Sequence, residues 1–154
     1  MAERWPDLAG RFEDRRHVLP VRVYYEDTDF SGAVYHANYL RFCERGRSDF
    51  LRLTGLFHSQ LQAPASGEPL AFAVRHMDID FLKPAGMDDA LEVETRLAQL
   101  SGAALSLDQR ILRHGEILFT ARVKVVVVDK RGRPRRLPPA LKSRLAPYLE
   151  PLSE

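Results

Sequence analysis

The chain has 154 residues, which is the size of a single domain. It carries 23 Lys and Arg against 21 Asp and Glu, so a net charge of +2 gives no indication of a nucleic-acid-binding surface. The one cysteine, Cys43, excludes an internal disulfide framework and suits a reducing compartment. No stretch approaches the roughly 20 apolar residues that span a bilayer, and no apolar signal segment opens the chain, so we expect a cytoplasmic protein.

The beginning of the chain is interpreted as an arm followed by a strand. Residues 1–19 are polar and charged, so we expect a loosely held arm, and then one domain over residues 20–150. Val21, Val23 and Tyr25 recur at every second position, which is the period of a half-buried strand. Ordered structure is therefore expected to begin near Val21.

A long amphipathic helix is predicted next. Asn38 is a good N-cap residue, and apolar side chains recur after it at helical spacing through Leu53. Gly55 follows as the expected C-terminal cap. Gly46 inside the helix costs about 1 kcal/mol relative to alanine, so we expect another element to pack closely against it. The apolar stripe consists of Tyr39, Cys43, Gly46, Phe50 and Leu53.

The rest of the chain alternates between apolar and polar residues as strands do. Turn signals of the hairpin type separate the alternating segments. One strand, one long helix and four successive strands predict an α+β fold, in which the helix covers one face of an antiparallel sheet. The four later strands are expected near residues 70–81, 91–98, 103–111 and 117–127.

Residues 24–39 contain the densest polar chemistry of the chain, in the sequence YYEDTDFSGAVYHANY. Gly32 allows a tight turn, and the following residues run into the helix, whose first amide N–H groups have no intrahelical acceptor. A carboxylate at Asp29 could face these amides. Such an arrangement can attack a carbonyl or activate water while an amide at or near His36 holds the oxyanion. We therefore expect acyl transfer to water, with Asp29 as nucleophile or general base.

A metal site is the main alternative for this segment. The spacing of Asp27, Asp29, Ser31 and Gly32 copies the first half of an EF-hand calcium loop. Position twelve of that loop should be a bidentate glutamate, and here it is Asn38. Metal binding is therefore disfavoured, and Asp27 is expected to form the turn.

Other polar groups give weaker signals. His76, Asp78 and Asp80 share one face of a predicted strand, but alternation produces such sets by chance. Cys43 lies on the apolar stripe and is expected to be a small buried side chain. The seven basic side chains within residues 130–144 form either a solvated face or a contact for the phosphates of a nucleotide-bearing substrate.

Residues 24–39, followed by Phe42-Cys43-Glu44-Arg45-Gly46-Arg47, resemble the signature of hot-dog-fold acyl-CoA thioesterases. The branch they resemble is the tol-pal-associated, YbgC-type thioesterases, which are related to the 4-hydroxybenzoyl-CoA thioesterases. Two later segments, residues 79–89 and 132–138, are similar to further parts of this family. The resemblance covers roughly residues 20–150.

The resemblance implies a five-stranded antiparallel sheet wrapped around a long central helix, no metal and no cofactor. It implies that Asp29 is the catalytic carboxylate and that His36 supplies a backbone N–H to the thioester carbonyl. Participation of the His36 side chain is implied for the YbgC branch. Tyr35, Asn38 and Gly32 would lie close to the substrate. The implied assembly is a homodimer or homotetramer with sites at the subunit interface, and an acyl carrier protein is considered as a further partner.

Two other functions compete with hydrolysis of acyl-CoA. The first is a non-catalytic hot-dog protein that binds acyl carriers or envelope-machinery partners, in which the arm and the basic tail would be the functional parts. The second is a hot-dog dehydratase. That chemistry uses a His-x-x-x-x-Pro-Gly segment, whereas His36 is followed by Ala-Asn-Tyr-Leu-Arg, so the dehydratase is disfavoured.

Overall fold

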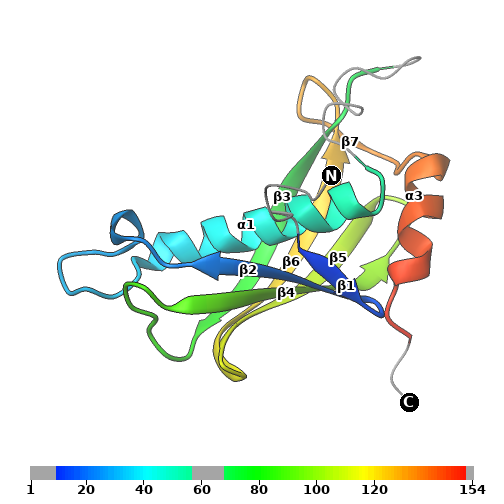
Figure 1. The fold of residues 1–154 in the computed structure, drawn as a ribbon. Helices are drawn as coiled ribbons and strands as arrows, with labels where there is room; N and C mark the ends of the chain where they lie inside the picture. Colours follow the sequence, from blue (N-terminus) through cyan, green and yellow to red (C-terminus); the bar gives the residue numbers. More distant parts are fainter. Residues whose placement is uncertain (1–9, 57–67, 152–154) are drawn as a thin grey trace, which may run out of the picture.

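The computed structural model describes residues 10–56 and 68–151. A long helix, α1 (His36–Leu53), lies across one face of a single antiparallel sheet, and a short helix, α3 (Pro139–Leu145), lies at one end of the sheet (Figure 1). Two short 3-10 turns are η1 (Tyr25–Asp27) and η2 (Ala146–Tyr148). The strands are β1 (Arg11–Glu13), β2 (Arg16–Arg22), β3 (Ala71–Phe81), β4 (Ala90–Leu100), β5 (Ala104–Arg113), β6 (Glu116–Val128) and β7 (Pro134–Arg135).

The sheet has the strand order β1-β2-β4-β5-β6-β3, and β7 pairs with β6 beyond the end of β5. The expected α+β hot-dog fold is confirmed, with β2 to β6 as its five longer strands and with β1 and β7 as short additions. The inward face of the sheet packs against α1 through side chains that are almost wholly buried. This core includes Phe42, Phe50, Val93, Ile111, Phe119 and Val123.

The expectation that ordered structure begins near Val21 is wrong. Strand β2 begins at Arg16, forms a hairpin with β1, and pairs with β4 from His17 opposite Thr95 to Arg22 opposite Ala90. The second half of the expected arm is therefore part of the sheet. Its polar composition hid a strand because its inward side chains are His17 and Leu19, which are buried beside α1. Residues 1–9 of the arm lie outside the described residues.

Helix α1 begins earlier than predicted. Its N-cap is Tyr35, so the assignment of Asn38 as the N-cap is wrong, and Asn38 lies buried in the first turn. The end of the helix is confirmed at Gly55, which has a φ of +91°. The Gly55 N–H donates to the Arg52 carbonyl and the Leu56 N–H to that of Leu51, which is a Schellman motif.

The buried face of α1 agrees with the predicted stripe except at its end. Four of the five expected residues are buried, whereas Leu53 is 37% exposed. The close packing expected at Gly46 is confirmed. A Cβ atom there would lie 2.8 Å from Val93 Cγ1 and 3.1 Å from Thr95 Oγ1, so the backbone of α1 lies directly against side chains of β4. Gln109 on β5 donates from Nε2 to the Cys43 carbonyl and to Thr95, which fixes this approach.

Candidate active site

A tight turn presents Asp29 in front of the start of α1. Gly32 has a φ of +85°, a conformation that glycine adopts without strain, so the turn role predicted for Gly32 is confirmed. The Gly32 N–H donates to the Asp29 carbonyl at 3.0 Å, and the Asp29 N–H donates to the Ala33 carbonyl at 3.0 Å. The turn thereby closes on itself and leaves the Asp29 carboxylate exposed.

The Asp29 carboxylate is held in its charged form by Ser31. Oδ1 accepts the Ser31 hydroxyl at 2.5 Å and the Ser31 N–H at 2.8 Å. These hydrogen bonds, first from the side chain and then from the backbone, lower the pKa of Asp29 below its ordinary value, and the charge of His36 acts in the same direction. Ser31 is a site residue that the sequence reasoning did not assign, although Asp-x-Ser is a frequent turn pattern.

His36 is the first residue of α1, and its ring is exposed beside Tyr35 and Phe81. The ring centroid lies 4.4 Å from that of Tyr35 and 6.4 Å from that of Phe81, which meets it edge-on. Helix geometry gives the first amide N–H groups no intrahelical acceptor, and no side chain caps this end of α1. Backbone donors and an ionised carboxylate therefore lie on the same short loop and first turn.

Asp27 and Asn38 lie below this loop, each only 6% exposed. Asn38 Nδ2 donates to Asp27 Oδ1 at 2.8 Å, and the Tyr24 N–H donates to Asp27 Oδ2 at 2.8 Å. The turn-forming role expected for Asp27 is confirmed, because it closes η1 through these contacts. Asp27 and Asp29 face different surroundings, and in the described part of the chain no group of three or more His, Cys, Asp or Glu side chains could hold a metal ion.

Large apolar side chains surround the turn on the surface. Their exposure is unusual for side chains of this size, and contiguous exposed apolar surface commonly marks a contact for a ligand or another chain. They lie at the end of β3, in the segment that follows it, and in residues 24–35 before α1. The exposed set is Tyr24, Tyr25, Phe30, Tyr35, Phe81, Leu82 and Met87.

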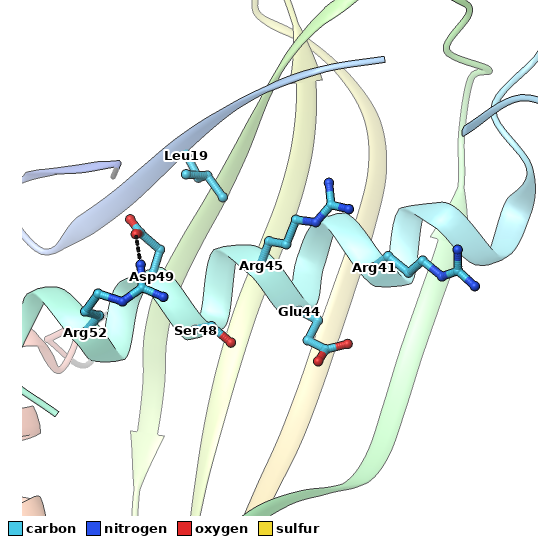
Figure 2. A pocket seen from close by; sticks show the side chains of 7 residues that line it. All are labelled: Leu19, Arg41, Glu44, Arg45, Ser48, Asp49 and Arg52. Atoms are coloured by element: carbon cyan, nitrogen blue, oxygen red, sulfur yellow. Dashed lines mark hydrogen bonds and ion pairs between the residues drawn. The ribbon is translucent and has the colours of Figure 1, made fainter. Parts of the chain in front are cut away.

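Two cavities lie along α1 and share Glu44 and Ser48 in their lining. An apolar cavity of about 280 Å³ opens between the second half of α1 and strands β3, β5 and β6. Its lining includes Leu51, Leu105, Leu107 and Val125, with Arg47 at the helix side. A polar groove of about 490 Å³ runs along α1 towards Leu19 of β2. Figure 2 shows its arginines, Arg41, Arg45 and Arg52, projecting from α1 along the groove.

The other predicted polar groups lie away from the Asp29 loop. The basic tail folds around Asp129, whose carboxylate accepts from the N–H groups of Arg131 and Arg133 and pairs with Arg135. These hydrogen bonds, with that of the Arg133 N–H first, lower the pKa of Asp129. The cysteine on the apolar stripe is buried as expected, which raises its pKa to about 12 and leaves it a neutral thiol.

Several known proteins are similar to this chain in sequence. A family model of the thioesterase-like superfamily matches residues 23–145. The acyl-CoA thioesterase YbgC of Haemophilus influenzae is 43% identical over 116 residues, which cover 75% of this chain and 83% of the relative. The acyl-CoA thioester hydrolase YbgC of an Escherichia coli O6:H1 strain is 43% identical over 124 residues, or 79% of this chain and 90% of the relative.

A solved structure is also similar to this chain, in both fold and sequence. The crystal structure of a probable thioesterase from Bartonella henselae superposes with a TM-score of 0.77 at 49% identity, covering 80% of this chain and 99% of that one. Fold and sequence together define a hot-dog protein of the α+β class. The chain belongs to the thioesterase-like superfamily and, within it, to the YbgC family of thioesterases. Neither helix of residues 10–56 and 68–151 is long and apolar enough to cross a membrane.

Proposed function

We propose that the chain hydrolyses acyl-CoA to a free carboxylate and coenzyme A, with Asp29 as nucleophile or general base and the backbone N–H at His36 as oxyanion donor. Similarity to the YbgC thioesterases supports the activity. The observation that carries the residue assignment is the ionised Asp29 carboxylate on a turn that runs directly into an uncapped helix start. Donors at a developing oxyanion contribute several kcal/mol to catalysis in hydrolases.

The reaction can follow either of two routes from this geometry. As general base, Asp29 takes a proton from water while the water oxygen attacks the thioester carbon, and the carbonyl electron pair moves to the oxygen near His36. Collapse of the tetrahedral intermediate breaks the C–S bond, and the thiolate leaves and takes up a proton. As nucleophile, Asp29 attacks the same carbon, and the C–S bond breaks to release the thiolate, which takes up a proton, and to leave a mixed anhydride on Asp29. Water then hydrolyses this anhydride to the free carboxylic acid and restores the Asp29 carboxylate.

The remaining site residues have supporting roles in this proposal. Tyr35 presents an exposed ring beside His36 and is placed to contact substrate. Gly32 has no side chain, so a substrate can approach the backbone of the turn closely at this position. Asn38 is buried and bonded to Asp27, so its position favours support of the loop over contact with substrate. The tail arginines that do not pair with Asp129 remain candidates for the coenzyme A phosphates.

The active form is proposed to be a homodimer or homotetramer with the site completed at a subunit interface. Support comes from the exposed apolar side chains around the Asp29 turn and from strand β3, which pairs with β6 alone among the described strands. An acyl carrier protein as an alternative acyl donor and a cytoplasmic location stay predictions. The polar groove along α1 carries three arginines that an acidic carrier could approach.

A thiol-release assay over short, long and aromatic acyl-CoA substrates tests the proposed activity. Asp29→Asn should lower kcat by at least about 100-fold, because it removes the nucleophile or base. Asp108→Asn is the matched control, since Asp108 is a partly exposed carboxylate on β5 that pairs with Arg122. If the wild type releases no coenzyme A from any of these substrates, the proposal is wrong. Near-full turnover by Asp29→Asn would reject the residue assignment but keep the enzyme class.

A further inference from the structure

A buried side-chain pair joins the Asp29 loop to the first turn of α1. Asp27 and Asn38 lie eleven positions apart and meet at 2.8 Å, and both are almost fully buried. Each stands two residues along the chain from a group in the proposed reaction, because Asp27 precedes Asp29 by two positions and Asn38 follows His36 by two. The hydrogen bond between Asp27 and Asn38 therefore links the loop that carries Asp29 to the helix turn that carries His36.

The same pair closes the base of the loop. Backbone contacts join residues 28 and 34 across the loop, and the Tyr35 N–H donates to the Asp27 carbonyl at 2.9 Å. The Val34 N–H donates to the Ala85 carbonyl at 2.8 Å, so the turn between β3 and β4 holds the second side of the loop. The hydrogen bond from Asn38 to Asp27 joins the loop base directly to α1, and the Ala85 N–H donates to the Tyr39 hydroxyl of the same helix.

The charge of the buried Asp27 carboxylate is stabilised by hydrogen bonds from Asn38 and from the Tyr24 N–H. Among the described residues the side-chain partners of Asp27 are hydrogen-bond donors and not cations, although Arg45 lines the same surface groove. A buried carboxylate without a cationic partner is costly unless its oxygens accept hydrogen bonds. Here Oδ1 accepts from Asn38 and Oδ2 accepts from the Tyr24 N–H. Loss of the Asn38 donor thus changes the position of the carboxylate as well as its energy.

We propose that Asp27 and Asn38 form a positioning pair that sets the placement of the Asp29 carboxylate relative to the backbone N–H at His36. The inference rests on the proposed function. Neither side chain touches the substrate, and the pair acts on the rate of thioester hydrolysis only through the geometry of the loop. Displacements of about 1 Å in a catalytic group can cost roughly 100-fold in rate.

An exchange of the carboxylate and the amide between positions 27 and 38 tests the proposal. Asn38→Asp places a second carboxylate against Asp27, and the two like charges should force the loop apart. We expect kcat to fall by about 10-fold to 100-fold while KM changes less than about 3-fold. The double variant Asp27→Asn/Asn38→Asp restores complementarity, since the new amide at position 27 can accept from the Tyr24 N–H and donate to the new carboxylate at position 38. Its kcat should return to within about 3-fold of the wild type.

The pH profile separates positioning from general loss of stability. Hydrogen bonds from Ser31 are the main cause of the low pKa of Asp29, and the charge of His36 adds to them. A loop displaced from His36 should therefore move the acid limb of kcat/KM to higher pH in Asn38→Ala, which adds no charge of its own. Asp49→Asn is the matched control: it alters another buried polar side chain of α1, and it should lower thermal stability without moving the acid limb. Asn38→Ala serves if Asn38→Asp does not fold, because it removes the donor without adding charge.

Two results would overturn the positioning role, and a third would overturn the catalytic assignment on which it rests. Wild-type kcat in folded Asn38→Asp or Asn38→Ala, with Asp29→Asn inactive, would overturn the positioning role and leave Asp29 as the catalyst. A folded double variant as slow as Asn38→Asp would also overturn it. An active Asp29→Asn would instead reject the catalytic assignment on which the pair depends.

Discussion

His17 is a fully buried histidine that the polar arm conceals in the sequence. Its Nε2 lies 2.7 Å from Asp49 Oδ2 on α1, and the Gly10 N–H donates to the same oxygen at 2.6 Å. The rings of Phe12 and Phe50 meet the imidazole edge-on. His17 Nδ1 has no hydrogen-bond partner within residues 10–56 and 68–151, as expected for a neutral ring that donates only from Nε2. This contact fastens the β1–β2 hairpin to the helix.

The buried imidazole should make stability depend on pH. Burial lowers the pKa of His17 below its ordinary value of 6.5, while Asp49 acts in the opposite direction. The unfolded chain therefore binds a proton more readily than the folded chain, so stability is present above about pH 6.5 and declines as the pH falls below it. Urea unfolding between about pH 5 and pH 7.5 should show this decline in the wild type.

His17→Gln should flatten that pH dependence, since the glutamine amide does not titrate. His76→Gln is the control, because His76 is exposed and bonded only to Asp78. Equal slopes of unfolding free energy against pH in wild type and His17→Gln would contradict the assignment. The groups that face His17 are Asp49, with Arg52 beside it, and the rings of Phe12 and Phe50.

Local sequence was sufficient for the site residues whose partners are near in sequence. The turn at Gly32 and the end of α1 at Gly55 could be anticipated because both depend on a few consecutive residues. The start of α1 was predicted three residues too late, since Tyr35 caps the helix without a side-chain hydrogen bond. The role of Asn38 could not, since its partner Asp27 is reached only when the loop folds back. His17 and Asp49 are 32 positions apart, so their pairing was equally hidden.

Helix α1 approaches the sheet most closely at Gly46, which makes this position a test of element packing. A Cβ atom there would lie 2.8 Å from Val93 Cγ1 and 3.2 Å from Gln109 Nε2, and both side chains are buried. Gly46→Ala gains about 1 kcal/mol in helix propensity. Overpacking costs about 1–3 kcal/mol, so the free energy of unfolding should fall by up to about 2 kcal/mol.

Urea unfolding measures this change, with Ser48→Ala as the control on the same helix. Ser48 is half-exposed, so its substitution should change the free energy of unfolding by less than about 0.5 kcal/mol. A Gly46→Ala variant more stable than the wild type would show that α1 can move away from β4. The Gln109 bonds to the Cys43 carbonyl and to Thr95 make that movement costly.

Strand prediction succeeded where side chains alternate and failed where they do not. Strands β4 and β6 have an inward apolar face and an outward polar face, so the period of two was visible. In β2, buried His17 replaces an apolar residue and Pro20 interrupts the pattern. The short β1 and β7 have only three and two residues, too few to show a period.

The two edges of the sheet differ in a way that bears on assembly. At one edge β1 has three residues, whereas at the other β3 has eleven residues and pairs with β6 alone among the described strands. Val74 on β3 is 46% exposed and Phe81 is 54% exposed. A long edge strand with exposed apolar side chains is a template for pairing with another chain. The asymmetry therefore favours association through β3.

A charge on β3 should dissociate the proposed oligomer. Val74→Arg places a cation at the exposed edge, and we expect light scattering after size exclusion to shift from dimer or tetramer towards monomer, with unchanged circular dichroism. Ser106→Arg adds the same charge on β5, where it should leave the mass unchanged. Activity per chain should fall with dissociation by about 10-fold or more if a second chain completes the site. A wild type that is monomeric and fully active would contradict both the proposed oligomer and a site shared between subunits. The exposed apolar side chains around the Asp29 turn would then be assigned to substrate contact alone.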